Sequence, residues 1–104
     1  EYLPIVKVQP QYPRRALSRG MTGWAIVEFT VTAQGTVKDA FIVSNCGWTK
    51  NRAESKCIDS PNSVFDKSAI RAASKFKYKP KVIDGEPVET AGVQNKIIFE
   101  LADD

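Results

Sequence analysis

Two cysteines are the residues of this chain best suited to forming a cross-link or binding a metal. Cys46 and Cys57 lie eleven positions apart in a polar stretch rich in turn-forming residues. The chain has no histidine and no third cysteine, so the pair cannot supply the four ligands of a closed zinc site. Catalytic redox pairs usually lie two residues apart near a helix start. We therefore expect a Cys46–Cys57 disulfide and an oxidising compartment, with two free thiols as the alternative.

The other side chains give little support for catalysis. There is no histidine to act as a general base, and no serine lies in a nucleophile-elbow motif. The aspartates and glutamates are scattered singly, and the chain has neither a glycine-rich phosphate loop nor metal-ligand spacing. The sequence therefore predicts a binding module that is not an enzyme and uses no cofactor or metal.

A basic and aromatic run in the second half of the chain would suit single-stranded nucleic acid. Its residues are Lys75, Phe76, Lys77, Tyr78, Lys79, Pro80 and Lys81. In the simpler interpretation the aromatic residues pack inward and the lysines are solvated near a helix end, where cations are favoured. The net charge is only +3. We therefore expect no nucleic-acid partner and keep such a binder as the weaker alternative.

The segment QPQYPRRA, residues 9–16, holds two prolines, two amides and two arginines around one tyrosine. Proline fixes its own φ and pushes the preceding residue toward an extended conformation, and Pro13 can open a helix. We expect a stiff polar ribbon followed by a short helix over residues 13–19, which ends at Gly20. From the residues alone, this ribbon is either packing material or a contact surface.

The composition fits one domain. The chain has 104 residues, of which 42% are apolar, so we expect a single unit over residues 1–104 with an extended N-terminal ribbon over residues 1–12. No apolar run approaches the roughly 20 residues that span a bilayer. An anchor or signal would therefore lie outside these residues.

Hydrophobic periodicity predicts a hairpin in the first half. Residues 23–32 alternate, and a turn at Gly35 leads into a second strand over residues 36–44. The apolar face of the first strand holds Ala25, Val27, Phe29 and Val31. The phase of the second strand requires a bulge near Lys38 and Asp39.

The second half predicts one amphipathic helix and one strand. Ser63 and Asp66 have the spacing of a capping box, and the helix is expected over residues 63–76. Its buried face should hold Phe65, Ala69, Ala72, Ala73 and Phe76. After a turn at residues 84–87, alternation predicts a last strand over residues 93–101.

The three strands are expected to form one antiparallel sheet. The hairpin strands run in opposite directions, and a right-handed crossover through the helix places the third strand beside the first, in the order 2-1-3. The fold class is therefore α+β, with a three-stranded antiparallel sheet packed by two helices and a disulfide-closed insertion loop. The third strand is an edge. The sheet face that carries Trp24, Ile26, Gln94 and Lys96 should be partly open.

Four segments, taken in order, resemble a known family. They are QPQYPRRA, GWAIVEFTVTAQGTV, VFDKSAIRAASKFKYKP and GVQNKIIFEL. Each is modest alone, but in this order they are similar to the C-terminal periplasmic domain of TonB-type energy transducers, from about Val8 to Leu101. The chain departs from that pattern in the insertion between Cys46 and Cys57, and in Phe76, where tryptophan is frequent.

The resemblance implies energy transduction without covalent chemistry. In this family the domain docks on TonB-dependent outer-membrane receptors, whose plug segment, the TonB box, adds as a strand to an exposed sheet edge. It implies a periplasmic domain, joined by an inner-membrane anchor outside these residues to a proton-channel complex that drives import, for example of iron siderophores. A TolA-like envelope adaptor is the alternative. A monomer or a weak homodimer is expected.

The resemblance also implies two sets of contact residues. The edge strand that would pair with the receptor segment comprises Val93, Gln94, Asn95, Lys96, Ile97, Ile98 and Phe99. The ribbon residues that would touch the receptor are Gln9, Pro10, Gln11, Tyr12, Pro13, Arg14 and Arg15. The amides of Gln9 and Gln11 would form hydrogen bonds, Arg15 would pair with an acidic plug residue, and the prolines would limit the ordering cost.

Overall fold

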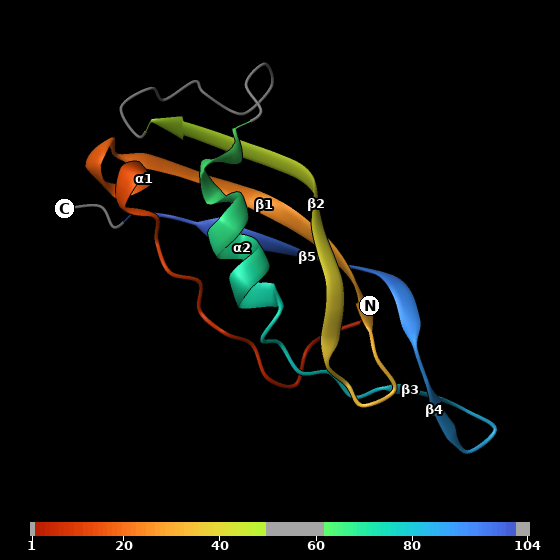
Figure 1. Ribbon diagram of the computed structural model, residues 1–104. Helices are drawn as coiled ribbons and strands as arrows, with labels where there is room; N and C mark the ends of the chain where they lie inside the picture. The colour runs from red at the N-terminus through yellow and green to blue at the C-terminus, as the bar shows by residue number, and fades with distance from the viewer. Residues whose placement is uncertain (1, 50–61, 102–104) are drawn as a thin grey trace.

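The computed structural model describes residues 2–49 and 62–101. One layer is a three-stranded sheet and the other holds two short helices (Figure 1), as the α+β prediction requires. The elements in chain order are the helix α1 (Arg14–Ser18), the strands β1 (Met21–Val31) and β2 (Val37–Thr49), the 3-10 turn η1 (Ser63–Phe65), the helix α2 (Asp66–Ala73), and the strands β3 (Lys81–Ile83), β4 (Glu86–Val88) and β5 (Thr90–Phe99).

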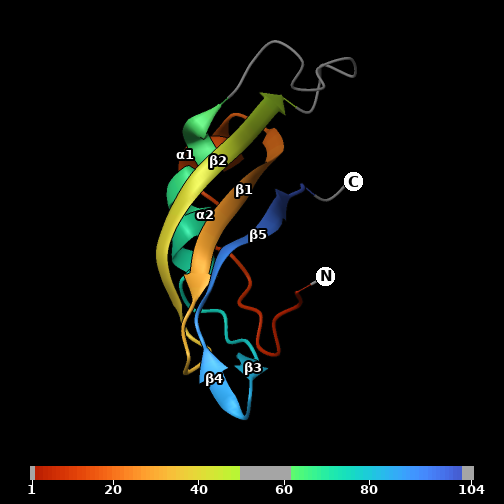
Figure 2. The same cartoon turned by 90° about the vertical axis from the view of Figure 1, so that its right-hand side faces the viewer.

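The sheet has the order β2-β1-β5, and both outer strands are antiparallel to β1. This confirms the predicted order 2-1-3. The β1–β2 turn uses Gly35, which has φ 83° and donates its N–H to the Thr32 carbonyl at 2.9 Å. Figure 2 shows α1 and α2 on the same side of the sheet, so neither helix covers the opposite face. We call that opposite face the open face.

Alternation along β1 places the core between the sheet and the helices. Every second residue of β1 is buried, and the residues between them are partly exposed. The buried side of α2 and its flanks is the one predicted: Phe65, Ala69, Ala72, Ala73 and Phe76. Burial of these apolar surfaces against β1 and β5 is the main force that holds the layers together.

β2 is longer and less regular than predicted. The expected end at residue 44 was wrong, because the strand continues and Cys46 lies within it. Two register shifts against β1 interrupt β2. One is the predicted bulge, at Asp39 with φ 56°. The other leaves Val43 without a partner residue on β1, and the sequence pattern did not reveal it.

The start of α2 differs from the predicted capping box. Asn62 caps the 3-10 turn η1 that leads into α2, because its side-chain oxygen accepts the Val64 N–H at 2.9 Å, and α2 itself has no side-chain cap. Ser63 instead lies in the first turn. Asp66 accepts from Asn45 Nδ2 at 3.1 and 3.2 Å, so its carboxylate ties α2 to β2. The capping-box prediction was therefore wrong in its residues, although a cap occurs at the expected place.

The segment that follows α2 contains one element that the sequence pattern missed. The helix ends at Ala73, before residue 76, and Phe76 and Tyr78 are buried while the neighbouring lysines are exposed. The turn predicted at residues 84–87 is part of a short hairpin of β3 and β4, with positive φ at Asp84 and Gly85. The exposed lysines agree with the solvated interpretation of the basic run.

The structure describes only one of the two cysteines. Cys46 is fully buried on β2, in register with Trp24 of β1. Cys57 lies outside the described residues, as does the insertion loop that the disulfide would close. The pairing of these two residues therefore stays a prediction.

Candidate partner-binding edge and ribbon

β5 forms one border of the sheet, as the sequence predicted. Its inner side pairs with β1 from Val93, opposite Phe29, to Phe99, opposite Gly23, without a break in register. Within residues 2–49 and 62–101, no strand pairs with its outer side. Alternate backbone N–H and C=O groups of an edge strand face outward and can pair with an added strand. The structure thus brings all of residues 93–99 to one border.

The described N-terminal segment leaves this border uncovered. Val6 forms an isolated antiparallel bridge with Lys77, in which each backbone N–H donates to the other residue's carbonyl at 3.1 and 3.0 Å. Tyr2 donates its hydroxyl to the Lys79 carbonyl at 2.7 Å. The residues before the ribbon are therefore paired with the segment that follows α2, and not with β5.

β2 is the other border, and its irregular register disfavours strand addition. The bulges at Asp39 and Val43 interrupt its pairing, and bulges bend and twist an edge strand. β5 has its register shift earlier in the chain, near Gly92 with φ 72°, so residues 93–99 remain regular. Of the two borders, β5 is the better template for a foreign strand.

The side chains of β5 alternate between the core and the open face. Those turned to the core and buried are Val93, Ile97 and Phe99, and those exposed on the open face are Gln94, Lys96 and Ile98. Gln94 Nε2 donates to Glu28 Oε1 of β1 at 2.8 Å. A strand added to β5 would place its side chains alternately beside these two sets.

Tyr12 fixes the ribbon to the end of β5. Its hydroxyl donates to the Met21 carbonyl, and its ring packs edge to face against Phe65 and Phe99, with centroids 5.7 Å apart in both pairs. Phe65 and Phe99 stack on each other at 4.4 Å. Burial raises the pKa of the Tyr12 hydroxyl. The partly buried Tyr12 ring thus packs against the core, whereas Gln11, Arg14 and Arg15 are exposed.

The remaining ribbon residues present polar groups at the surface. The exposed ones are Gln9, Gln11, Arg14 and Arg15, and the partly exposed ones are Pro10 and Pro13. Gln9 and Gln11 line a small hollow of about 90 Å³ between the ribbon and α2, together with Arg71 and Lys75. The ribbon therefore lies along α2, with the amides of Gln9 and Gln11 accessible. Tyr12, which packs on Phe99, holds the ribbon near the end of β5.

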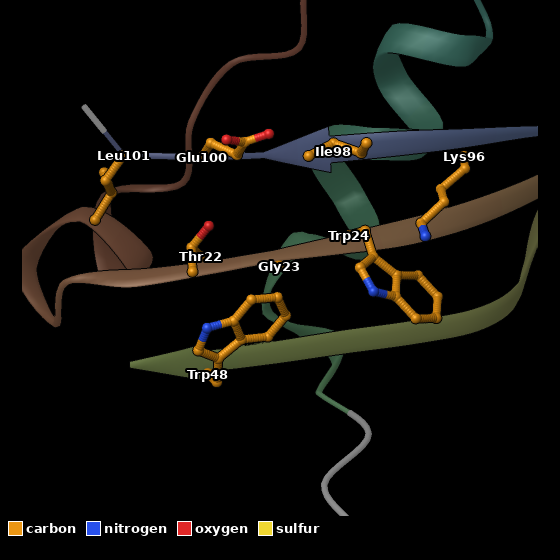
Figure 3. A pocket seen from close by; sticks show the side chains of 8 residues that line it. All are labelled: Thr22, Gly23, Trp24, Trp48, Lys96, Ile98, Glu100 and Leu101. Atoms are coloured by element: carbon orange, nitrogen blue, oxygen red, sulfur yellow. The ribbon is translucent and has the colours of Figure 1, made fainter. Parts of the chain in front are cut away.

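The sequence reasoning missed Trp48, which lies on the open face. β2 pairs Trp48 with Thr22 of β1, and the Trp48 side chain helps to line a hollow of about 370 Å³ (Figure 3). Trp24 lines the same hollow, and Lys96 Nζ lies 4.7 Å from its ring centroid. Periodicity extended through residues 45–49 would have placed Trp48 on the same face as Trp24.

The described part of the chain carries groups that can bind a partner by non-covalent contacts. Within residues 2–49 and 62–101, no cluster of three acidic or cysteine side chains has the geometry to hold a metal ion. In the same ranges, no helix has the length and apolar character needed to cross a bilayer. What these residues supply is a backbone border, amides, cations and aromatic rings.

The chain matches one family model, that of the Gram-negative bacterial TonB protein C-terminal, over residues 8–53 and 50–101. Protein TonB of Vibrio cholerae is 32% identical over 86 residues, which cover 83% of this chain and 30% of the relative. Protein TonB of Pseudomonas aeruginosa is 28% identical over 85 residues, or 82% of this chain and 21% of the relative. The chain thus spans less than a third of the length of these relatives.

Solved structures show the same fold. The solution NMR structure of the Pseudomonas aeruginosa TonB CTD has a TM-score of 0.67 at 24% identity and covers 98% of this chain and 88% of that chain. The structure of the TonB2 protein from Vibrio anguillarum has a TM-score of 0.62 at 29% identity and covers 99% and 84%. The Helicobacter pylori TonB-CTD has a TM-score of 0.56 at 24% identity and covers 91% and 72%.

Proposed function

Since the chain belongs to the family of C-terminal domains of Gram-negative bacterial TonB proteins, we propose that it docks outer-membrane receptors by accepting their TonB-box segment as a strand on β5. The observation that carries this proposal is the regular border over residues 93–99, whose outer side no described strand occupies. Strand addition suits a module that serves several receptors, because backbone hydrogen bonds form with almost any sequence.

In the proposal, side chains of the ribbon contact the receptor in addition to the backbone pairing along β5. Gln9 and Gln11 are exposed amides, and Arg15 is an exposed cation on α1. In the proposed complex the amides form hydrogen bonds with the receptor plug, and Arg15 pairs with an acidic group there. The flanking prolines hold this segment extended, so that little conformational entropy is lost on binding.

The physical task is to transmit force. A strand pulled along its own direction loads several backbone hydrogen bonds together, which suits the displacement of a receptor plug. In the proposal, a membrane anchor beyond this chain couples the domain to a proton-driven complex of the inner membrane, and the domain works in the periplasm. The domain contributes attachment, and the proton gradient supplies the energy.

Titration calorimetry tests the docking site, with a TonB-box peptide taken from a receptor of the organism that makes this protein. Lys96→Pro and Ile98→Pro place a residue without an N–H group in the proposed docking border. We expect these two variants to bind the peptide at least tenfold more weakly than the unmodified domain. Circular dichroism identifies the variants that retain the fold.

Val43→Pro is the matched control. Val43 is also an exposed apolar residue of an edge strand, and it lies at a bulge where proline is tolerated. This variant should bind like the unmodified domain. If Lys96→Pro and Ile98→Pro are folded and bind with unchanged affinity, β5 is not the docking site.

A further inference from the structure

The side chains that the proposed docking border turns to the open face differ in chemistry from one end to the other. Gln94, Lys96 and Ile98 belong to β5 and Glu100 follows it directly, and all four are exposed. Figure 3 shows Lys96, Ile98 and Glu100 in this order along the border. The amide of Gln94 is already bonded to Glu28 of β1. The border therefore presents a cation, an apolar side chain and an anion at every second residue.

The two border charges have no opposite charge beside them. Four residues of a strand span about 13 Å, so Lys96 and Glu100 stand well apart, on either side of the apolar residue. Among the residues that the structure describes, the only ion pair joins Lys38 to Glu89. Lys96 Nζ instead lies 4.7 Å from the ring centroid of Trp24. Each charge is thus available to a side chain of an added strand.

Backbone pairing alone does not fix the register of a strand added to β5. A slip of one residue turns every side chain of that strand to the other face, and a slip of two restores the faces with new neighbours. Side chains that lie directly opposite each other on one face have Cβ atoms about 5 Å apart, so their chemistry decides between registers. Lys96, Ile98 and Glu100 lie on β5 itself and are the direct neighbours of such a strand.

We propose that Lys96 and Glu100 set the register of the receptor segment that adds to β5. The segment carries an acidic residue opposite Lys96, a basic residue opposite Glu100 four positions away, and an apolar residue midway, opposite Ile98. Opposite charges in directly opposed positions stabilise a strand pair and like charges destabilise it. This inference rests on the proposed function and deepens it by naming the side chains that the docking site selects.

The selection at each position is modest because both charges are exposed. Water and salt weaken exposed ion pairs. To meet a carboxylate of the added strand, the Lys96 side chain turns its ammonium away from Trp24, and a cation–aromatic contact at an exposed site is itself weak. Glutamate and lysine guests at the same position should therefore differ by about fivefold in affinity.

A charge scan of the receptor peptide tests this pairing. The host is a TonB-box peptide whose own charged residues are replaced by glutamine, and glutamate, lysine or leucine is placed in turn at each position. Calorimetry should show one position at which glutamate binds about fivefold tighter than lysine, and a second, four positions away, at which lysine binds tighter by a similar factor. Leucine should bind best at the position midway. The spacing of four holds for a parallel and for an antiparallel added strand, because opposed residues advance together.

Charge reversal in the domain identifies the border residues. Lys96→Glu should invert the preference at the first position only, and Glu100→Lys at the second only. Lys96→Gln should abolish the first preference without inverting it. Lys81→Glu and Glu86→Lys are the matched controls, because they change the net charge equally at exposed residues of the β3–β4 hairpin. Both controls should keep both preferences, and circular dichroism shows which variants retain the fold.

The outcomes separate this pairing from the docking proposal. If the peptides bind, but glutamate and lysine guests have equal affinity at every position, or the two sensitive positions are not four apart, the pairing is overturned and strand addition to β5 stands. A first preference that survives Lys96→Glu in a folded variant, or that Lys81→Glu also inverts, overturns the pairing as well. If the natural TonB-box peptide does not bind at any concentration tested, the proposed function itself fails.

Discussion

The Tyr12 ring meets the Phe99 ring edge to face, with centroids 5.7 Å apart and an interplanar angle of 83°. This contact joins the N-terminal ribbon to the last strand of the sheet, although the two residues are far apart in the chain. Because Phe65 stacks on Phe99, the start of α2 shares the same cluster. The two sets of proposed contact residues are therefore held together by one aromatic cluster, Tyr12, Phe65 and Phe99.

Tyr12→Phe should separate packing from receptor contact. The substitution keeps the ring and removes the hydrogen bond from the hydroxyl to the Met21 carbonyl, which should lower the free energy of unfolding by about 1 kcal/mol. Urea denaturation measures this change. Peptide affinity should stay the same; a loss of affinity at unchanged stability would instead place the Tyr12 hydroxyl in the interface.

The exposed ribbon residues should behave in the opposite way. Gln9→Ala and Gln11→Ala should each weaken peptide binding by about 0.5 to 1.5 kcal/mol and leave the melting temperature unchanged, because both side chains are exposed. Arg15→Glu should weaken binding more, and the difference should shrink as salt is added. Calorimetry over a salt series measures both effects. Unchanged affinity in all three variants would mean that the ribbon serves only for packing.

The strands that alternate cleanly could be predicted from the sequence, and the end of β2 could not. β1 has one buried face, so its apolar residues recur at every second position. Toward the end of β2, Asn45 faces the helices and bonds to Asp66, and Gly47 lies opposite Gly23. Asn45 and Gly47 are placed by contacts with other elements and are not apolar, so the alternation of apolar and polar residues that predicts a strand is absent here.

The tight packing around Gly23 also escaped sequence reasoning. A Cβ built at Gly23 would meet the Cys46 carbonyl oxygen, and it would lie 2.9 Å from Cε2 of Phe65. Only the three-dimensional arrangement shows that these residues meet. In the same way, periodicity predicted the last strand and the expected crossover placed residues 93–101 on an edge, but the inward packing of Tyr12 depends on a contact with Phe99 that sequence spacing does not reveal.

The cysteine pair gives a prediction independent of the docking site. The Cys46→Ala, Cys57→Ala double variant should lose about 3 kcal/mol of unfolding free energy, as the closure of a loop of this length predicts. Treatment of the unmodified domain with a reducing agent should cause a similar loss. Because Cys46 is fully buried, alkylation is carried out on unreduced protein in denaturant; it should modify neither residue, and two reactive thiols would contradict the disulfide.

Alkaline pH should destabilise the domain through the partly buried Tyr12 and the buried Tyr78. Burial raises the pKa of Tyr12 and of Tyr78, whereas tyrosines of the unfolded chain ionise near pH 10. The folded state therefore keeps these protons to higher pH than the unfolded state does. The resulting stability is fully present below about pH 10 and is lost as the pH rises through the folded pKa values.

Tyr78→Phe should make that alkaline loss shallower, as measured by urea denaturation at a series of pH values. The hydrogen bond from Lys38 to Glu89 at 2.8 Å also raises the pKa of Lys38. Loss of the Lys38 proton at alkaline pH therefore lowers the stability as well. Lys38→Met is therefore the matched control, since it removes the lysine contribution and keeps both tyrosines. An alkaline loss that is as steep in Tyr78→Phe as in the unmodified domain would contradict the assignment to Tyr78.

Amide hydrogen exchange, followed by NMR with and without a TonB-box peptide, tests most directly whether β5 accepts a foreign strand. Half of the β5 amides already bond to β1, and the alternate amides face outward. We predict that saturating peptide slows exchange at alternate residues within 93–99 and leaves the amides of β2 unchanged. Protection along β2, or no new protection along β5 when the peptide is bound, would contradict the account.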